Sequence, residues 1–511
     1  MKRALISVSD KTNLVEFATS LSNLGYEIIS TGGTKQALDK ANVKNISIDE
    51  VTGFPEILDG RVKTLHPKVH GGLLYVREDN KHVKQVTDLQ IQAIDLVCVN
   101  LYPFKKTIQK EGFTHDEAIE NIDIGGPSML RSAAKNYRYV TVVTDINDYD
   151  TVIAEITEHG DTLYETRERL ASKVYQTTAA YDCMIADYFL KKSNIMYPDQ
   201  LTMTFEKKQA LRYGENPHQS ASFYVESTTE SFSIANAIQL HGKELSYNNI
   251  QDANATLQIL KEFSNNACCV AVKHMNPCGV GIGDDIYQAW RKAYEADDVS
   301  IFGGIVAFNH EIDINVALEL SEIFLEIVLA PSFTAQALEI LERKKNIRIM
   351  TFSAKNSVKD LRQFTSVCSG MLVQQVNNAV VNEDMLQLVT KVKPTDSEIN
   401  DLMFGDRVVK HVKSNAIIVV KDGQTLGIGA GQMNRVGAAK IALEQAGLKA
   451  KGAVLASDAF FPMDDTVELA SEYGISAIIQ PGGSINDQKS IDLCDKKGMS
   501  MVFSHTRHFK H

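Results

Sequence analysis

At 511 residues the chain is too long for one hydrophobic core, and its length predicts about three or four domains. Apolar residues make up 44% and charged residues 23%, which is typical of a folded globular protein and excludes a largely disordered one. A formal net charge of -11 gives no general attraction to phosphate polymers or anionic lipid, so nucleic acid and membrane partners are disfavoured.

The N-terminal segment MKRALISVSDK has only a short apolar run between polar residues, which does not suit a signal peptide. No apolar stretch approaches the roughly 20 residues that are needed to cross a bilayer. The seven cysteines form no Cys-x-x-Cys pair, as expected of reduced thiols. We therefore expect a cytoplasmic protein without a membrane segment.

Residues 1–197 alternate short β-rich runs with amphipathic helical stretches, which predicts an α/β domain with a mainly parallel sheet. The expected strands are 4–9, 26–31, 94–102 and 139–145. A helix should follow the first strand, with Asp10 as its cap and Gly25 as its stop. A long helix over 167–192 leads into the loop SNIMYPDQ, and the first boundary is placed near 197.

The rest of the chain is again mixed α/β, with strand-like segments ACCVAVKH, GGIVAFN, AIIVV and ISAIIQ. A connector around Pro394 leads into a helix near 396–412, and we divide this part into 198–393 and 394–511. Two segments, 270–283 and 411–431, each pair a lysine-bearing strand with a glycine-rich turn. This similarity suggests two related subdomains.

Three features before residue 197 favour an anionic ligand. Small residues end two strands, at Ser7–Lys11 and Thr31–Thr34, where helix N-terminal amides can hold a phosphate. The segment GRVKTLHPKVHGG gathers five basic side chains, and IDIGGPSMLRSAAKN places Asp123 before a glycine turn and Lys135 on a helix. Ordinary tight turns and a solvated surface would give the same patterns. From the residues alone, only a small phosphorylated ligand is indicated.

In this order SVSDKTNLVEFA, STGGT, GRVKTLHPKVHGG, NLYPF and IDIGGPSMLRSAAKN resemble the IMP cyclohydrolase domain, whose fold is similar to methylglyoxal synthase. The resemblance covers residues 1–197. It implies that Lys135 handles protons during ring closure, with Lys63, Tyr102 and Asp123 around it. It also implies that formyl-AICAR and IMP are held by Ser9, Asp10, Lys11, Thr31, Gly32, Gly33, Thr34, Arg61, Lys63, Thr64, Asn100, Asp123 and Ile124. Ring closure is intramolecular and loses water, so no metal is needed.

After residue 197 the sequence offers a loop, LRYGENPHQ, and the adjacent pair Lys273 and His274 at the end of a buried strand. Structural and catalytic roles for this pair stay open. Pro277-Cys278 matches the start of the Pro-Cys-x-x-Cys signature of zinc deaminases, but the second cysteine position is Gly281. Zinc is therefore disfavoured.

The segments LRYGENPHQ, AVKHMNPCGVGIG, IFGGIVAFN, FLEIVLAPS, KSNAIIVVKDGQTLGIGAGQMNRV, ASDAFFPMDD, PGGS and HTRHFKH resemble AICAR formyltransferase motifs, in order, across 198–511. The resemblance implies a tandem of cytidine-deaminase-like α/β subdomains without the metal, and a homodimer with this site across the interface. It implies that His274 takes a proton from the AICAR amine, that Lys273 stabilises the transition state, and that 10-formyltetrahydrofolate is the co-substrate. AICAR-binding positions are Arg212, Tyr213, His274, Gly303, Glu326, Asn415, Arg435 and Arg507, and the folate positions are Asp458 and Ser484.

Two alternatives remain at this stage. One is a metal-dependent nucleoside deaminase with a phosphate-binding regulatory domain, and the other is a nucleotide-sensing protein without turnover. Formation of IMP from AICAR and 10-formyltetrahydrofolate separates all three.

Overall fold

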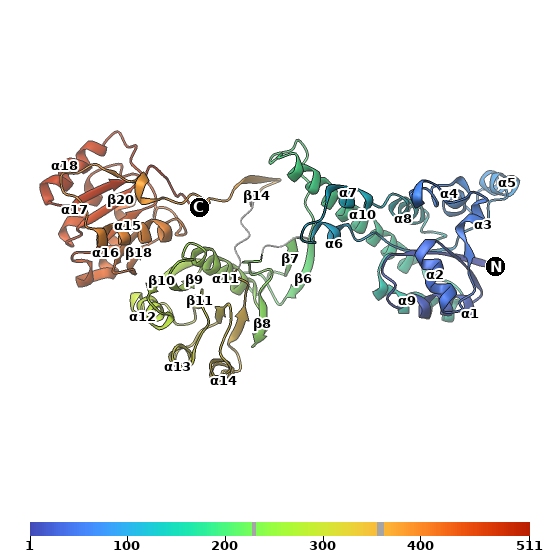
Figure 1. Ribbon diagram of the computed structural model, residues 1–511, viewed down its shortest axis with the longest axis horizontal. Coiled ribbons are helices and arrows are strands. Elements are labelled where there is room, and N and C mark those ends of the chain that lie inside the picture. Colours follow the sequence, from blue (N-terminus) through green and yellow to red (C-terminus); the bar gives the residue numbers. More distant parts are fainter. Residues whose placement is uncertain (227–230, 355–361) are drawn as a thin grey trace. The chain divides into compact units, whose positions relative to one another are not determined.

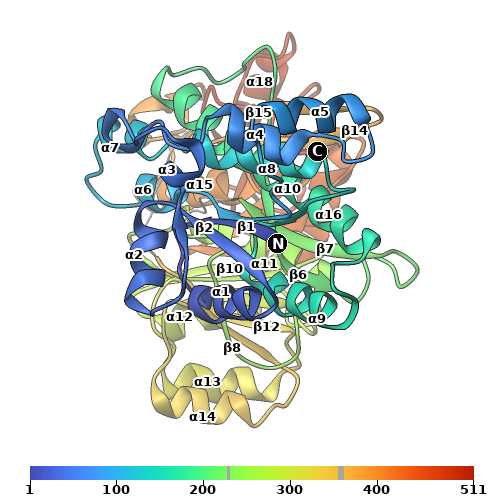
Figure 2. The ribbon, with the colours of Figure 1, turned by 90° about the vertical axis from the view of Figure 1, so that its right-hand side faces the viewer.

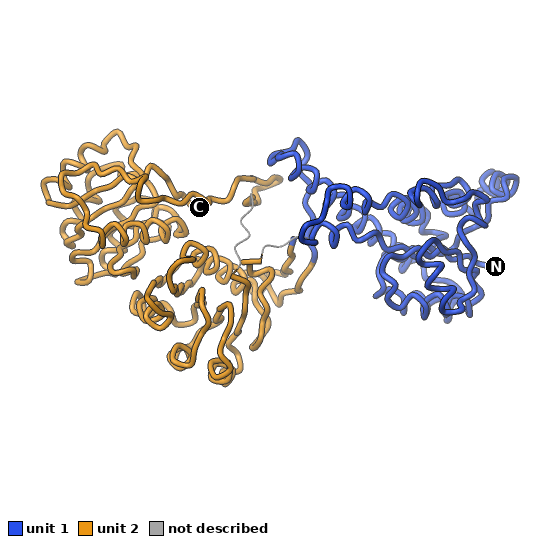
Figure 3. The backbone as a smooth tube through the Cα atoms, viewed as in Figure 1, with its two compact units in different colours: residues 1–206, 226–228 blue, residues 207–225, 229–511 orange. Residues whose placement is uncertain are grey.

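The computed structural model describes residues 1–226, 231–354 and 362–511. They form two compact units, which Figure 3 colours separately. The first contains Met1–Glu206 together with Glu226, and the second contains Lys207–Val225 and the described residues from 231 to the C-terminus. The predicted domain limit near 197 lies in the segment between α10 and β6, shortly before this break, and stays a prediction.

The first unit is built on a five-stranded sheet with the order β3-β2-β1-β4-β5, in which every pair is parallel. Its strands are β1 (Lys2–Val8), β2 (Tyr26–Ser30), β3 (Ile46–Ser47), β4 (Leu96–Asn100) and β5 (Thr141–Val143). Ala4, Leu5 and Ile6 are buried in succession, as in a strand that helices cover on both faces. The predicted parallel sheet is confirmed.

Helices cover both faces of this sheet. Figure 2 shows β1 and β2 between α1 and α9 on one side and α4 and α8 on the other, and the ring of Phe17 on α1 stacks on Tyr149 of α9. The helices are α1 (Leu14–Asn23), α2 (Gly32–Lys40), α3 (Ile48–Thr52), α4 (Pro67–Leu74), α5 (Asn80–Asp88), α6 (Phe104–Ile108), α7 (His115–Glu120), α8 (Gly125–Lys135), α9 (Tyr149–His159) and α10 (Tyr164–Lys192). Short 3-10 turns lie at η1 (Leu58–Gly60) and η2 (Ile146–Asp148).

The predicted cap of the first helix was wrong. Asp10 does not cap α1, because its carboxylate accepts the N–H and hydroxyl of Thr12, at 3.0 and 2.7 Å. Asn13, in the left-handed conformation, precedes the helix and caps it without a side-chain hydrogen bond. Asp10 therefore shapes the loop between β1 and α1.

The second unit is built on a sheet of twelve strands with the order β16-β21-β20-β19-β17-β18-β10-β9-β11-β12-β13-β8. Figure 1 labels some of its strands, among them β9, β10, β11, β18 and β20. The strands are β8 (Ile238–His241), β9 (Ala267–Lys273), β10 (Asn276–Gly283), β11 (Ile305–Phe308), β12 (Ile327–Ala330), β13 (Arg348–Thr351), β16 (Gln387–Leu388), β17 (Ile417–Lys421), β18 (Gln424–Gly429), β19 (Val454–Ser457), β20 (Ala477–Gln480) and β21 (Ser500–Phe503). Two hairpins stand apart from it, β6 (Phe205–Leu211) with β7 (Ala221–Glu226), and β14 (Arg362–Val367) with β15 (Gly370–Gln375).

The two halves of this sheet repeat one arrangement. In each half an antiparallel hairpin, β9–β10 or β17–β18, is followed outwards by three parallel strands and one antiparallel edge strand. The weak similarity between 270–283 and 411–431 thus corresponds to an internal repeat. Because β16 pairs with β21, the second half of the repeat begins before residue 394.

The glycine-rich segments were predicted as turns, and this was wrong, because they are the strands β10 and β18. A methyl group on Gly279 would overlap the carbonyl oxygen of Ala293 on α12, and one on Gly427 would overlap that of Ala442 on α16. The glycines therefore let a helix pack directly on each strand. The helices of this unit are α11 (Tyr247–Leu260), α12 (Ile286–Ala296), α13 (Ile314–Glu322), α14 (Ala335–Glu342), α15 (Asp396–Val409), α16 (Arg435–Ala446), α17 (Asp465–Glu472) and α18 (Asp487–Lys497), with 3-10 turns η3 (Glu383–Met385) and η4 (Gly447–Ala450).

Within the three described ranges, no helix has the length and apolar character to cross a membrane. All seven cysteines are free, and six of them are buried.

Candidate active site

The first unit contains a cavity of about 490 Å³ at the carboxyl ends of β1, β2 and β4. The segment around residues 59–64 and the start of α8 complete its wall. Ligands of open parallel sheets bind at this edge, where strand ends and helix N-termini meet. The predicted residues that line it are Ser9, Lys11, Thr31, Gly32, Gly33, Thr34, Arg61, Lys63, Thr64, Asn100, Tyr102, Asp123 and Ile124.

Two of the predicted polar residues build the cavity wall through hydrogen bonds within the protein. The side-chain oxygen of Asn100 accepts the backbone N–H of Ser9 at 2.6 Å and that of Asp10 at 3.0 Å. The hydroxyl of Thr34 accepts the N–H of Val8 at 3.0 Å and is buried. These contacts fix the loop after β1 against β4 and α2.

Two lysine amines gather at the N-terminus of α2. A Cβ placed on Gly33 would lie 3.6 Å from Nζ of Lys11, and one placed on Gly32 would lie 3.6 Å from Nζ of Lys63. The amine of Lys63 also lies 3.7 Å from the carboxylate of Glu56. Two cations and a helix N-terminus with small residues form a place where a phosphate can sit.

Asp123 is a half-buried acid in the lining of the cavity. Its carboxylate accepts the N–H of Gly126 at 2.8 Å and, more weakly, that of Tyr102 at 3.4 Å. A methyl group on Gly126 would overlap this carboxylate, so a larger residue here would displace it. Burial raises the pKa of Asp123, although the two N–H groups and the charge of Lys63 act in the opposite direction. The group is thus suited to exchange a proton.

Arg61 lines the cavity in a close ion pair. Its Nη2 lies 2.5 Å from one carboxylate oxygen of Glu120, and its Nε lies 3.4 Å from the other. Both side chains remain exposed to solvent, at 64% and 56%. Sequence patterns gave no sign of Glu120, because a glutamate at a helix end looks like an ordinary surface residue.

Two predicted residues do not line this cavity. Asp10 is exposed and bonded to Thr12. Lys135 is exposed at the last residue of α8, ten residues after Gly125 at the cavity wall. A helix rises about 1.5 Å per residue, so about 15 Å separate the two ends. Within one chain, Lys135 therefore lies apart from Lys63 and Asp123.

In the second unit, Lys273 ends β9 and His274 follows in a tight turn. His274 and Met275 both have positive φ, 52° and 64°. Their backbone N–H groups donate to the carboxylate of Asp252 on α11, at 3.3 and 2.7 Å. The amine of Lys273 donates to the carbonyl of Phe302 at 2.9 Å. Asp252 thus stabilises a strained turn, and sequence reasoning missed it.

The same sheet edge holds further predicted residues of the first half. Gly303 precedes β11, and Glu326 precedes β12, where its carboxylate pairs with Arg348 at 2.5 Å. The side chain of Asn276, just after the His274 turn, accepts the N–H of Lys413 at 3.1 Å. This contact links the turn to the segment that carries Asn415 in the second half.

Asp458 and Arg435 form a buried pair in the second half. Nη1 of Arg435 lies 2.5 Å from one oxygen of Asp458, and the hydroxyl of Ser414 donates to the other at 2.5 Å. Nη2 of Arg435 donates to the side-chain oxygen of Asn415 at 2.7 Å. Asp458 has no exposed surface, and its predicted contact with a pterin stays a prediction. The pair orients Asn415.

The remaining predicted residues lie in loops and at the chain end. Arg212 stacks on Tyr213, with its guanidinium 5.6 Å from the ring centroid, and Arg507 stacks on Phe509 at 4.6 Å. The hydroxyl of Ser484 accepts the N–H of Asn486 at 3.2 Å.

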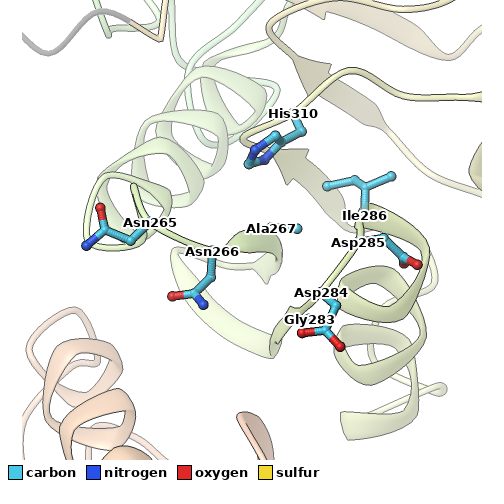
Figure 4. Close-up of a pocket in the computed structure, with 8 residues that line it drawn as sticks. All are labelled: Asn265, Asn266, Ala267, Gly283, Asp284, Asp285, Ile286 and His310. Carbon is cyan, nitrogen blue, oxygen red and sulfur yellow. The ribbon is translucent and has the colours of Figure 1, made fainter.

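A second cavity, of about 480 Å³, lies beside Ala267, Asp284 and His310 (Figure 4). None of the predicted residues lines it. Ala267 is the first residue of β9 and Lys273 the last, so about 20 Å separate this cavity from the His274 turn at 3.3 Å per residue. In the described ranges, no group of three His, Cys, Asp or Glu side chains is arranged to hold a metal ion.

Comparisons with known proteins found two family models and several full-length relatives. A family model described as the AICARFT/IMPCHase bienzyme matches residues 133–445, and a model of the MGS-like domain matches residues 13–128. Among curated relatives, a bifunctional purine biosynthesis protein PurH from Listeria monocytogenes is 60% identical over all of both chains. Proteins of the same name from Oceanobacillus iheyensis and Bacillus cytotoxicus are each 58% identical, again over all of both chains.

Proposed function

The chain belongs to the AICARFT/IMPCHase bienzyme family, and from this premise we propose how its residues divide the two reactions. It is a bifunctional enzyme of purine biosynthesis, with AICAR formyltransferase and IMP cyclohydrolase activities. A formyl folate is the co-substrate of the first reaction. The deaminase and sensor alternatives are therefore set aside.

We assign cyclisation to the cavity of the first unit. The observation that carries this assignment is the convergence of Lys11, Lys63 and the α2 N-terminus in a cavity whose lining also contains Asp123. The phosphate of formyl-AICAR is proposed to sit at the two lysines, with Arg61 of the same lining as a further contact. The carboxamide and formyl groups then face Asp123 and Tyr102. Fixing the reactive conformer supplies much of the rate, since the attack is intramolecular.

Asp123 is proposed to exchange the protons of ring closure. The carboxamide nitrogen loses a proton as it attacks the formyl carbon, and the hydroxyl that forms leaves as water after protonation. An acid whose pKa is raised by burial holds a proton more readily than an exposed carboxylate. Lys135 stays a prediction of the resemblance, and its distance from the cavity means that it can act only on a site of a second chain.

Supplying formyl-AICAR directly to the Asp123→Asn variant tests the assignment. Cyclisation should fall by roughly 10²- to 10⁴-fold, as for the loss of a general acid or base. Formyl transfer, measured on the same preparation, should stay normal. Normal cyclisation would remove Asp123 from the mechanism.

We assign formyl transfer to the His274 turn of the second unit. His274 takes a proton from the 5-amino group of AICAR as the nitrogen attacks the formyl carbon of 10-formyltetrahydrofolate, and Lys273 stabilises the oxyanion. Tetrahydrofolate leaves, so no metal or redox partner is needed. Support comes from the sheet edge that places Lys273, Gly303 and Glu326 near one another.

The other predicted AICAR contacts, which remain proposals, are Arg212, Tyr213, Asn415, Arg435 and Arg507, and Ser484 is proposed for the folate. Asp458 is proposed as a contact of the pterin, and it also holds Arg435, which donates to Asn415. The His274→Ala variant should lose formyl transfer and still cyclise added formyl-AICAR. A normal rate of formyl transfer would contradict the assignment.

The proposed assembly is a cytoplasmic homodimer with the formyltransferase site across its interface. A protein that sediments as a monomer at its working concentration would overturn this part. The domain limits of 1–197, 198–393 and 394–511 are likewise proposed. The repeat supports two subdomains after residue 197, but β16 places the start of the second one before residue 394.

A further inference from the structure

The cavity assigned to cyclisation must receive an anion, yet the charges of its lining residues are balanced. Three cationic side chains face three carboxylates in the lining, Lys11, Arg61 and Lys63 against Asp59, Glu120 and Asp123. A nucleoside monophosphate carries close to two negative charges near neutral pH. Attraction of that phosphate therefore depends on how firmly each cation is held by a carboxylate.

Arg61 is the cation that is held most closely. Glu120 contacts it through both carboxylate oxygens, at 2.5 and 3.4 Å, which is the side-on geometry that a phosphate also uses. The pair joins two separate stretches of the wall, the segment after η1 and the end of α7. A carboxylate does not favour the C-terminal end of a helix, so α7 gains nothing from Glu120.

We infer that Glu120 is an internal competitor for the substrate phosphate. It holds the guanidinium of Arg61 and must release it when the nucleotide binds. Glu120 thereby lowers the affinity for nucleotide and helps product IMP to leave. This inference rests on the proposed role of Arg61 as a contact of the nucleotide.

The effect should be moderate, because both partners are solvent-exposed. Exposed ion pairs contribute little, so the loss of this one alone should change the affinity by no more than about fivefold. Removing the carboxylate also gives the lining a net positive charge, which attracts the anionic nucleotide more strongly. Salt weakens this added attraction by screening. We expect the Glu120→Gln variant to bind IMP about two- to tenfold more tightly at low salt, with a smaller gain at high salt.

The test is isothermal titration of IMP into the full-length protein and its Glu120→Gln and Glu78→Gln variants, at low and high salt. Glu78 is the matched control, because its pair with Arg138 has similar exposure, 63% for each side chain, and does not line the cavity. Tighter binding by Glu120→Gln and unchanged binding by Glu78→Gln support the inference. Unchanged or weaker binding by Glu120→Gln overturns it.

A double-mutant cycle with Arg61→Ala separates this inference from the proposed function. If Glu120 competes for Arg61, its substitution has no further effect once Arg61 is alanine. An equal gain in both backgrounds would overturn the competition. Should Arg61→Ala alone leave IMP affinity unchanged, the proposed contact itself fails. Normal formyl transfer by each variant shows that the chain is folded.

Discussion

The carboxylate of Asp252 accepts the backbone N–H of Met275 at 2.7 Å and holds the strained turn that presents His274. A residue outside α and β conformations persists only when its surroundings fix it. Burial raises the pKa of Asp252, while the two N–H donors of the turn favour its ionised form. We therefore regard Asp252 as a positioning residue for formyl transfer.

Asp252→Ala should lower kcat for formyl transfer by about 10- to 100-fold, because a displaced base loses its alignment with the amine. The cyclisation of added formyl-AICAR should not change. The control is Asp298→Ala, an exposed aspartate in the same unit. Equal kcat values for Asp252→Ala and the parent enzyme would show that the turn does not need this carboxylate.

The decrease in the cyclisation rate at acidic pH should reflect protonation of the Asp123 carboxylate. Burial raises the pKa of this carboxyl above its ordinary value of 3.8, so it takes up a proton at a higher pH than an exposed aspartate. The folded protein binds this proton more readily than the unfolded chain. Its contribution to stability is therefore present at low pH and is lost as the pH rises through the folded pKa.

If ring closure needs the ionised form, kcat/KM for cyclisation should fall as the pH drops through that raised pKa. The measurement is a pH profile with formyl-AICAR as substrate, compared with Asp123→Asn, whose residual rate should lack this limb. A limb at or below 3.8 in the parent enzyme would argue against a role for Asp123 in the rate.

The sequence predicted the first unit well, because local patterns specify it. Buried runs such as Ala4 to Ile6 indicate strands that both faces cover, and small residues after β1 and β2 mark the ligand edge. The sequence pattern did not predict the strands β10 and β18, because a glycine-rich segment usually indicates a turn. Here the reason for glycine is the close approach of a helix, which depends on tertiary packing.

The motifs placed most site residues but could not give their partners. Glu120 and Asp252 act through contacts with Arg61 and the His274 turn, far from them in sequence. Burial could not be predicted from the motifs either. Asp458, which the resemblance places at the pterin, has no exposed surface and lies in contact with Arg435. A match to a motif identifies a residue, whereas its role depends on which of its atoms remain free.

Lys63 and Lys135 lie at different places in one chain, and this yields a test of subunit sharing. Lys63→Ala should lower cyclisation by roughly 10²-fold or more, since its amine lies at the cavity. If a second chain delivers Lys135, as the resemblance and the proposed homodimer together require, Lys135→Ala is also impaired. Mixing the two variants then restores activity in hybrid dimers that contain one complete site.

Full cyclisation by Lys135→Ala would instead leave proton handling to Asp123 and the residues around it. If Lys135→Ala lowers cyclisation and the mixture does not recover activity, Lys135 stabilises the structure of α8 rather than completing a shared site. Formyl transfer by both variants is the internal control.

The pair of Arg435 and Asp458 leads to a prediction about stability. Removing one partner of a buried pair leaves the other charge without compensation, at a cost of about 3–5 kcal/mol. Asp458→Ala should lower the free energy of unfolding of the second unit by this amount. The only tryptophan, Trp290, is fully buried in that unit, so its fluorescence during urea unfolding reports the change.

The control for this experiment is Glu339→Ala, which removes an exposed pair with Arg343 and should shift the same transition by less than about 1 kcal/mol. Asn415 receives a hydrogen bond from Arg435, so Asp458→Ala should also raise KM for AICAR. A normal unfolding midpoint combined with a raised KM for the folate alone would show that Asp458 reaches the pterin after all. In that case the buried pair must open when the folate binds.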